Sequence, residues 1–212
     1  MARLEFESKF LSMVSVPHGN GEWVYATRNK VIDGIVPKPK LDTVTIVPII
    51  KTIKNDNISF ETVLIESYRK PLQSREIGFA AGLVDDGETD AEAAKRELFE
   101  ETGLELINTI HITPTLSVSS GMTDEMYRIV YAYAKGKETN ENQEEDEDIT
   151  VYRVNINEIY DFIKERHEKG VQISGRSYQS IQYLTGICTS LKLVYKEKPL
   201  SLKKEQFEKH FK

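Results

Sequence analysis

Three glutamates that follow an arginine are the residues of this chain best suited to carry out chemistry. Glu97, Glu100 and Glu101 come directly after Arg96 in the run Arg-Glu-Leu-Phe-Glu-Glu. A helix turns by about 100° per residue, so Glu97 and Glu101 lie one turn apart on one face and Glu100 flanks them. Like charges at this spacing repel one another, which favours a bound cation that neutralises them. Oxygen-only ligands suit Mg²⁺ or Mn²⁺, so we predict a divalent-metal site that acts on phosphate.

The segment around these acids has the local signals of a helix that could present them. Thr89 is a good N-cap, and Glu92 three residues later completes a capping box. Gly103 stands where a helix would end on a glycine. A solvated acidic helix would explain these signals, but it would not explain the glutamate cluster or two glycines at fixed distances from it. We expect the buried stripe of this helix to consist of Ala91, Ala94 and Leu98.

The wider pattern around the helix is more specific. Gly82 is followed after five residues by Glu88, and after seven more by Arg96-Glu97-Leu98-x-Glu100-Glu101-x-Gly103-Leu104. This pattern resembles the Nudix box at every fixed position, and Nudix hydrolases cut nucleoside diphosphates linked to another moiety. Within that family the chain looks most like the branch that hydrolyses ADP-ribose and related ADP-sugars.

The resemblance implies a metal site with an all-oxygen ligand set. Glu97 and Glu101 would be the principal ligands of Mg²⁺, or of Mn²⁺, and Glu100 would be a further ligand. The carbonyl oxygen of Ala81, just before the first glycine of the box, would complete the site. A pyrophosphate-cleaving enzyme needs such ions to activate water and to neutralise phosphoryl oxygens.

The other fixed residues of the box would support these ligands. Arg96 would orient a box carboxylate rather than act as a catalyst in its own right. Gly82 would let the loop backbone turn close to the metal, because glycine has no side chain to hinder the approach. Glu88 would have a structural role behind the ligands.

A general base is needed as well. In the ADP-ribose branch that this chain resembles, the base is a glutamate on a loop before the last strand of the catalytic body. Here five adjacent acids, residues 144–148, precede the strand-like Ile149-Thr150-Val151. We predict Glu147 as the base, with Glu145 as the second candidate. The alternative is a solvated loop in which no acid takes part in catalysis.

Substrate binding is expected to involve an aromatic residue and two arginines. The spacing of Trp23 and Arg28 resembles the ADP-sugar branch, in which a tryptophan stacks on adenine and an arginine binds the diphosphate-ribose portion. Arg69, in Tyr68-Arg69-Lys70-Pro71, resembles the aromatic-Arg-x-Pro segment that precedes the box in this branch. The alternative for a lone tryptophan is a place in the hydrophobic core.

Two positions depart from the branch pattern. The branch has Glu-x-Pro-Ala-Gly before the box helix, whereas this chain has Gly78-Phe79-Ala80-Ala81-Gly82 and lacks both the glutamate and the proline. A proline about sixteen residues beyond the box is replaced by Ser120. Both departures bear on the identity of the substrate and leave pyrophosphate hydrolysis itself unaffected.

Composition and patterning place these motifs in an α/β protein. A chain of 212 residues with a net charge of −6 and no basic stripe is not expected to bind nucleic acid. No apolar run is long enough for a membrane helix, and the first residues lack a signal-peptide core, so we expect a cytoplasmic protein. Strand-like segments and later amphipathic helices predict a mixed sheet, and the resemblance implies an α/β/α sandwich.

We expect residues 1–42 to form a small N-terminal β region and residues 43–212 to form the catalytic domain with its C-terminal helices. The N-terminal region is too small to fold comfortably alone and should pack on another surface. In the branch that this chain resembles, the corresponding region is shared across a homodimer, which would bring substrate-binding residues to a partner's site.

The sequence therefore predicts a metal-dependent hydrolase that cuts ADP-ribose or a related ADP-sugar to AMP and a sugar phosphate. One alternative keeps the enzyme and changes the substrate to another nucleotide sugar, a dinucleoside polyphosphate or an oxidised nucleotide. The other alternative is a Nudix-like domain that senses a nucleotide without cleaving it. Such domains typically lose box carboxylates, and this chain retains them all.

Overall fold

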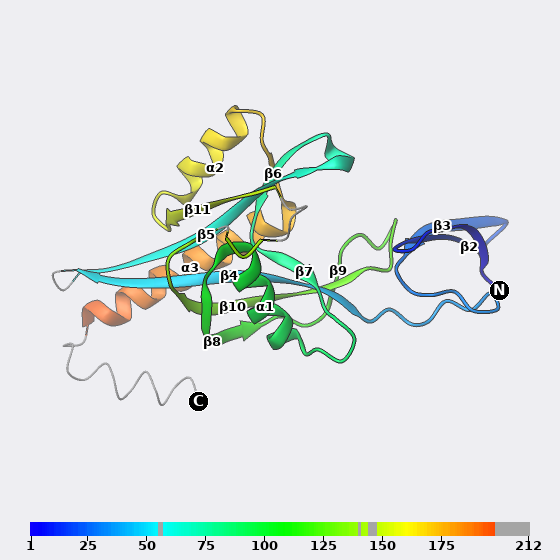
Figure 1. The fold of residues 1–212 in the computed structure, drawn as a ribbon, viewed down its shortest axis with the longest axis horizontal. Helices are drawn as coiled ribbons and strands as arrows, with labels where there is room; N and C mark the ends of the chain where they lie inside the picture. The colour runs from blue at the N-terminus through cyan, green and yellow to red at the C-terminus, as the bar shows by residue number, and fades with distance from the viewer. Residues whose placement is uncertain (55–56, 140, 144–147, 198–212) are drawn as a thin grey trace.

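A long hairpin made of β4 (Leu41–Lys54) and β5 (Asn57–Arg69) organises the protein, as the computed structural model in Figure 1 shows. The structure describes residues 1–54, 57–139, 141–143 and 148–197. The strands are β1 (Arg3–Glu7), β2 (Ser12–His18), β3 (Gly21–Thr27), β4 (Leu41–Lys54), β5 (Asn57–Arg69), β6 (Ser74–Gly78), β7 (Ala81–Leu83), β8 (Glu105–Ile112), β9 (Leu116–Ser117), β10 (Met126–Lys135), β11 (Ile149–Asn155) and β12 (Gln172–Ile173). The helices are α1 (Asp90–Thr102), α2 (Ile159–Glu168) and α3 (Gly175–Glu197), with a 3₁₀ turn, η1, at Lys70–Leu72.

Two sheets are built from these strands. The N-terminal sheet has the antiparallel order β1-β2-β3. The main sheet has nine strands in the order β12-β6-β5-β4-β10-β8, with β11 paired to β5, β7 to β4 and β9 to β10. β4 is central: it runs antiparallel to β5 and parallel to β10, with Thr43 opposite Tyr127. The mixed sheet that the sequence predicts is therefore present.

Alternation along β4 divides the core into two layers. Val44, Ile46 and Ile50 are buried on the face that α1 covers, together with Ala93, Ala94 and Leu98 of that helix. Val47 and Ile49 are buried on the opposite face, against residues of α2 and α3. Ile159 and Ile163 of α2, and Ile181, Leu184 and Cys188 of α3, complete that second layer. Helices thus cover both faces of the sheet, which confirms the predicted α/β/α arrangement.

Helix α1 begins and ends where its local signals predict. Thr89 is the N-cap and forms a reciprocal capping box with Glu92. Gly103 closes the helix at a positive φ of 72°, a conformation that favours glycine. The predicted buried stripe was wrong at one position: Ala91 is exposed, and Ala93 is buried in its place.

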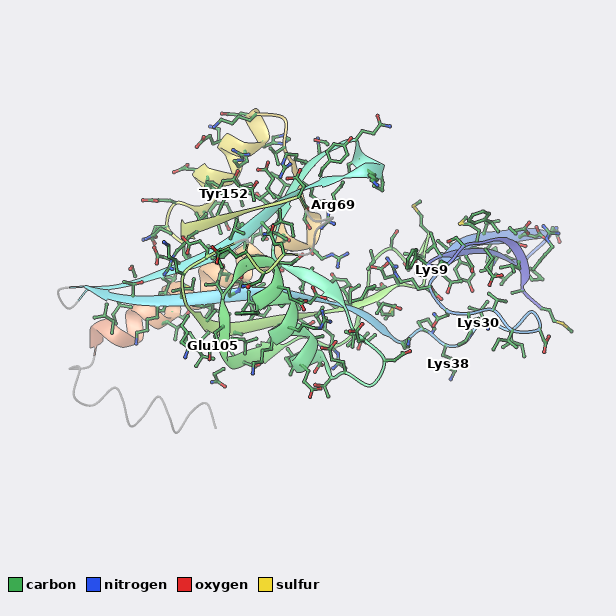
Figure 2. All side chains as sticks on the ribbon, in the orientation of Figure 1. Lys9, Lys30, Lys38, Arg69, Glu105 and Tyr152 are labelled. Atoms are coloured by element: carbon green, nitrogen blue, oxygen red, sulfur yellow. The ribbon has the colours of Figure 1, made fainter. Side chains whose placement is uncertain are left out.

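The N-terminal sheet lies at one end of the molecule and touches the body through the segment before β10 (Figure 1). Figure 2 shows the side chains of this N-terminal region, among them Lys9 and Lys30 beside the sheet, set apart from those of the main sheet. The N–H of Ala26 donates to the carbonyl oxygen of Met122 over 2.9 Å, and the Thr27 hydroxyl donates to Asp124 over 2.8 Å. The attachment is therefore polar and specific.

Hydropathy along the three helices gives no sign of a membrane span. Among the described residues, no helix combines the length and the apolar composition that crossing a bilayer requires.

Candidate active site

Helix α1 lies against the short strand β7, and the contact is made by the glutamates that the sequence singled out. An ideal Cβ built on Gly82 would lie only 1.9 Å from Oε1 of Glu97, so the Glu97 carboxylate lies directly against the glycine backbone. The N–H of Ala81 donates to Oε2 of Glu101 over 2.8 Å. Glu97 and Glu101 thus contact two adjacent residues of β7, Gly82 and Ala81.

The backbone of β7 also directs a carbonyl group toward this helix. Ala80 and Val84 bond to the central strand, since the Ala80 oxygen accepts from Ile46 and the Val84 N–H donates to Asp42. Polar backbone groups alternate along a strand, so those of Ala81 lie on the other edge, as its bond to Glu101 shows. The Ala81 carbonyl therefore lies on the edge of β7 that faces α1.

Arg96 holds the charged groups of the box together. Its guanidinium donates two bonds to the Glu88 carboxylate, at 3.0 and 2.9 Å, and one to the carbonyl oxygen of Leu83 at 2.9 Å. Its third nitrogen donates to Glu97 at 2.7 Å and to Glu100 at 3.1 Å. The bonds to Glu88 are the main reason that the pKa of Arg96 is raised and that the pKa of Glu88 is lowered.

These positions fit a hard divalent cation by their donor chemistry. Glu97 and Glu100 share one nitrogen of Arg96, and Glu97 and Glu101 contact neighbouring residues of β7. With the Ala81 carbonyl they form a set made only of oxygens, which suits Mg²⁺ or Mn²⁺. In the described part of the chain, no group of three or more His, Cys, Asp or Glu side chains is arranged so that it could hold a metal ion. Arg96 and the Ala81 N–H engage the box carboxylates in this structure.

The environment of Glu101 is not that of a solvent-exposed helix face. Glu101 is buried, with 5% of its surface accessible. A buried carboxylate needs hydrogen-bond donors, and the Ala81 N–H supplies one. Glu97 is largely buried as well, whereas Glu100 keeps 38% of its side-chain surface exposed.

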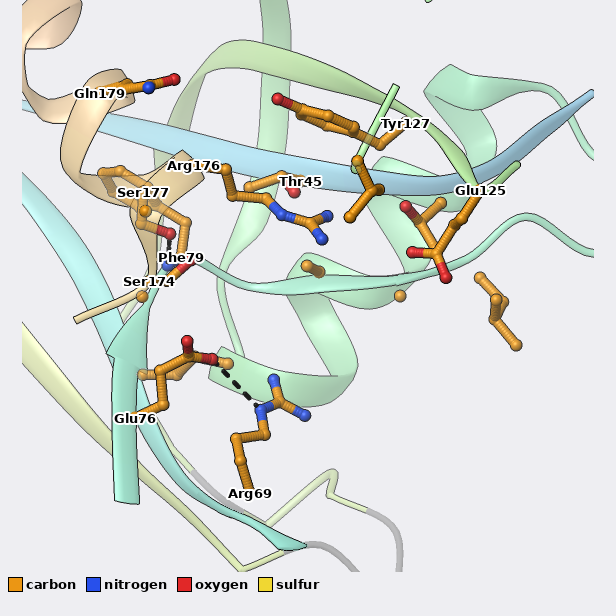
Figure 3. Close-up of a pocket in the computed structure, with 18 of the residues that line it drawn as sticks. Thr45, Arg69, Glu76, Phe79, Glu125, Tyr127, Ser174, Arg176, Ser177 and Gln179 are labelled. Carbon is orange, nitrogen blue, oxygen red and sulfur yellow. Dashed lines mark hydrogen bonds and ion pairs between the residues drawn. The ribbon is translucent and has the colours of Figure 1, made fainter. Parts of the chain in front are cut away.

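A cavity of about 900 Å³ opens beside β7 (Figure 3). Its walls include one predicted metal ligand, Ala81, the box glycine Gly82, and two of the predicted substrate-binding residues, Arg28 and Arg69. Arg28 pairs with Glu125 at 3.1 Å, and Arg69 pairs with Glu76 at 3.6 Å. The structure therefore brings four predicted site residues, from widely separated parts of the sequence, to one cavity.

Other residues of the cavity were missed by sequence reasoning. Arg176, in the first turn of α3, lies with its guanidinium carbon 4.7 Å from the centre of the Tyr127 ring. Ser177, next in the chain, accepts a bond from the Phe79 N–H at 3.0 Å. Nothing in the local sequence Ser-Gly-Arg-Ser signals a binding site, because only the tertiary fold brings α3 to the box.

Trp23 does not line this cavity. It is 42% exposed and lies on a second cavity, of about 530 Å³, together with Tyr25, Pro37 and Pro39. Ser120, which replaces the proline of the branch pattern, lines that second cavity too. Within one chain, the predicted adenine-stacking residue and the predicted diphosphate-binding Arg28 therefore belong to different cavities.

The predicted general bases, Glu147 and Glu145, lie outside the described residues. Asp148, directly after them, is held by Arg75, whose guanidinium donates to the carboxylate at 2.6 Å. Arg75 also donates to the buried Glu66 at 2.8 Å, so the start of β11 is fixed to the core of the sheet.

Asp42, near the start of β4, lies where β4 meets β10 and the end of β7. It is buried, its carboxylate accepts from the Met126 N–H at 2.9 Å, and its carbonyl oxygen accepts from the Val84 N–H at 2.9 Å. Burial raises the pKa of this carboxyl group above its ordinary value, and the Met126 bond opposes that shift only in part.

Comparison with known proteins agrees with this geometry. The sequence model of the NUDIX domain matches residues 47–173. A methanol dehydrogenase activator of Bacillus methanolicus is 35% identical over 118 residues, which is 54% of this chain and 60% of that protein. The ADP compounds hydrolase NudE of Escherichia coli is 36% identical over 91 residues, 43% of this chain and 44% of that protein. Mouse ADP-sugar pyrophosphatase is 36% identical over 63 residues, 29% of this chain and 27% of that protein.

Each of these matches spans less than two thirds of the relative's own length. The fold extends further: a solved structure of an ADP compounds hydrolase superposes with a TM-score of 0.61 at 20% identity, covering 90% of this chain and 93% of that one. The family match covers more than half of the chain, and the box helix, its glycine and its arginine are in place. The chain belongs to the Nudix hydrolase family.

Proposed function

We propose that this protein hydrolyses the diphosphate bond of ADP-ribose or a related ADP-sugar, giving AMP and a sugar phosphate. The observation that carries the proposal is the placement of Glu97 and Glu101 against Gly82 and Ala81 of β7, two residues that line the cavity containing Arg28 and Arg69. Two of the relatives described above are named for the hydrolysis of ADP-sugars or ADP compounds, which supports adenine-linked substrates.

Each part of the site would have a distinct task. Glu97, Glu100, Glu101 and the Ala81 carbonyl would hold Mg²⁺, which supplies charge neutralisation and an activated water when bound. Arg96 would keep the carboxylates oriented through its bonds to Glu88 and to the Leu83 carbonyl. Glu147, or else Glu145, would accept the proton of the attacking water.

Arginines would hold the substrate on the other side of the cavity. Arg28 and Arg69 each carry a planar guanidinium, which can donate two parallel bonds to phosphate. Their present partners, Glu125 and Glu76, keep both side chains oriented within the cavity wall. A diphosphate would then lie between the arginines and the glutamates of α1.

The N-terminal region would complete the binding site of a second copy of the chain. We propose residues 1–42 as a dimer-forming region and residues 43–212 as the catalytic domain. Trp23 is 42% exposed and is separate from the cavity of Arg28 in its own chain. A partner whose cavity faced this tryptophan would gain a stacking surface for adenine.

A panel of substrates tests the proposed function. The protein would be assayed for release of AMP or phosphate from ADP-ribose, ADP-glucose, UDP-glucose, a diadenosine polyphosphate and 8-oxo-dGTP, with and without Mg²⁺. Preferential release of AMP from an ADP-sugar, lost without metal, supports the proposal. Binding of a nucleotide without turnover of any substrate would contradict it and favour a sensing domain.

A second candidate keeps the chemistry and changes the substrate to another nucleoside diphosphate derivative. The observation in its favour is the glycine at position 78, which lies in the cavity wall and brings no carboxylate there. Metal-dependent turnover of UDP-glucose, a dinucleoside polyphosphate or 8-oxo-dGTP in preference to ADP-ribose would select this candidate.

A further inference from the structure

The cavity beside β7 contains a third arginine that neither the box nor the predicted substrate contacts include. Arg176 lies in the first turn of α3 and outside residues 47–173, the part of the chain that the family model matches. In Figure 3 its side chain extends from the start of the helix into the cavity, beside the ring of Tyr127. Arg176 is therefore not part of the segment that the family model matches.

Not every charged residue of the cavity wall has an ion-pair partner among the described residues. Arg28 is paired with Glu125 at 3.1 Å, and Arg69 with Glu76 at 3.6 Å. Arg176 has no ion-pair partner among the residues that the structure describes, and its guanidinium lies 4.7 Å from the centre of the Tyr127 ring. The lining contains three arginines and two glutamates, so one positive charge remains uncompensated and belongs to Arg176.

The Tyr127 ring contacts this guanidinium without occupying its hydrogen-bond donors. A cation over an aromatic face is attracted by the ring, while the N–H groups at its edge stay available for a planar acceptor. Tyr127 is itself held in the sheet, opposite Thr43 of β4 and Leu116 of β9. The arrangement is therefore preorganised for two hydrogen bonds to one phosphate group.

The start of α3 is fixed to the strand that leads into the box. The Ser177 hydroxyl accepts the Phe79 N–H at 3.0 Å. A Cβ on Gly78 would stand 2.8 Å from that hydroxyl oxygen and 3.0 Å from the Cβ of Ser174, so glycine permits the close packing. The first turn of α3 contains no acidic residue, so the positive end of the helix adds to the charge of Arg176.

We propose that Arg176 binds the diphosphate of the substrate. Among the described residues of the cavity wall, it is the arginine whose positive charge is not paired with a carboxylate. The proposal rests on the proposed function, since it assigns a phosphate contact to the same site. Arg28 and Arg69 then form part of the cavity wall, where their ion pairs orient them, and Arg176 is the residue whose positive charge the substrate neutralises.

Binding of inorganic pyrophosphate in the presence of Mg²⁺, measured by isothermal titration calorimetry on the full chain, tests the proposal. Arg176→Gln should weaken binding by about tenfold or more, because it removes a charged hydrogen-bond donor. Arg176→Lys should bind with intermediate affinity, since it keeps the charge and loses the planar fork. Lys164→Gln, which removes one exposed charge from α2 far from the cavity lining, should bind like the unchanged protein.

A second variant tests the placement of the arginine rather than its charge. Gly78→Ala keeps Arg176 but should push Ser174 and Ser177 away, and it should weaken pyrophosphate binding while the thermal transition stays cooperative. Unchanged affinity in Arg176→Gln, or no binding of pyrophosphate by the unchanged protein, would overturn the proposal.

This experiment separates the two proposals. Arg176-dependent binding of pyrophosphate, in a protein that turns over no ADP-sugar, would leave the phosphate contact standing and reject the proposed function. Turnover of an ADP-sugar with the same KM in Arg176→Gln would do the reverse.

Discussion

The carboxylate of Glu97 occupies the space where a side chain on residue 82 would begin. A Cβ at Gly82 would meet both carboxylate oxygens of Glu97, at 1.9 and 2.2 Å. The glycine of the box is therefore required by the close approach between β7 and α1. It is not required by an unusual backbone angle, since Gly82 does not have a positive φ.

The first prediction follows from this contact. Gly82→Ala should reduce turnover of the best substrate by about 100-fold or more, because displacing a metal ligand removes several kcal/mol of transition-state stabilisation. The melting temperature should change little, since the clash is with the far end of a flexible side chain. Gly186→Ala on α3, where a Cβ would meet nothing within 4 Å, serves as the control and should keep full activity. Equal activity in both variants would show that the position of Glu97 does not matter.

The second prediction concerns the buried Glu101. Glu101→Gln keeps an oxygen that can accept the Ala81 N–H, so the fold should be retained. Loss of the negative charge should lower kcat by about 100-fold or more with saturating Mg²⁺. Glu105→Gln, at an exposed ion pair with Lys135, is the matched control. Normal turnover by Glu101→Gln would exclude Glu101 as a metal ligand.

The third prediction concerns Trp23 and the second copy of the chain. Trp23→Ala should raise KM for an ADP-sugar by about 5- to 100-fold with little change in kcat, because base stacking contributes about 1–3 kcal/mol. Phe10→Ala, an exposed aromatic of the same region, should leave KM unchanged. Sedimentation would show whether the active species is a dimer. A KM that stays constant in Trp23→Ala would place adenine elsewhere.

The fourth prediction is a pH dependence of stability. The pKa of Asp42 is raised by burial, so the folded state holds its proton more tightly than the unfolded chain, whose carboxyl has a pKa near 3.8. The stabilisation by the neutral form is full below that value and is lost as the pH rises through the higher, folded pKa. Asp42→Asn, which keeps an acceptor for Met126, should therefore melt at a higher temperature than the unchanged protein at pH 7.

Melting curves between pH 3 and pH 8 would check this expectation. The difference between Asp42→Asn and the unchanged protein should shrink as the pH falls through the raised, folded pKa of Asp42, and it should be smallest and constant below the unfolded value of 3.8. A difference that is constant across the range would mean that the ionisation of Asp42 is not its source.

The fifth prediction concerns the buried network of Glu66. Its carboxylate is 3% exposed and accepts from Arg75 and from Arg166. Glu66→Ala should lower the free energy of unfolding by about 3–5 kcal/mol, because it leaves two arginine groups without their buried partner. Glu61→Ala, on the same strand, removes a more exposed partner of Arg153 and should cost about 1 kcal/mol. Urea titrations of both variants would compare the losses, and similar values would argue against a special role for burial.

The parts of the site that could be predicted from sequence are those with local signals. The capping box at Thr89, the glutamate spacing and the closing Gly103 are encoded within fifteen residues, and α1 forms as they indicate. The burial of Glu101 could not be foreseen, because its hydrogen-bond donor lies twenty residues earlier on a different element. Arg28 meets Glu125 across 97 residues, and no local pattern announces that pairing.

The same limit applies to Arg176 and to the helices beyond the box. Asn157 is a reasonable N-cap by residue type, yet α2 takes Glu158 as its N-cap, without a side-chain bond. The apolar face of α3 was predictable, since Ile181, Leu184 and Cys188 recur at helical spacing and are all buried. Where the first turn of that helix would lie depends on Gly78, which admits it, and no periodicity encodes such a contact.

The parallel pairing of β4 with β10 has a consequence for how activity arises as the chain folds. The Met126 N–H reaches Asp42 across 84 residues, so this central seam forms only after a long loop has closed. Closing a long loop costs chain entropy before the native contacts form that offset it, so chains with such topologies fold slowly. Helix α1 can form early from its own signals, but the cavity wall that joins Thr43 to Tyr127 cannot. Refolding protein should therefore regain helical content before it regains the cavity that the proposed substrate would occupy.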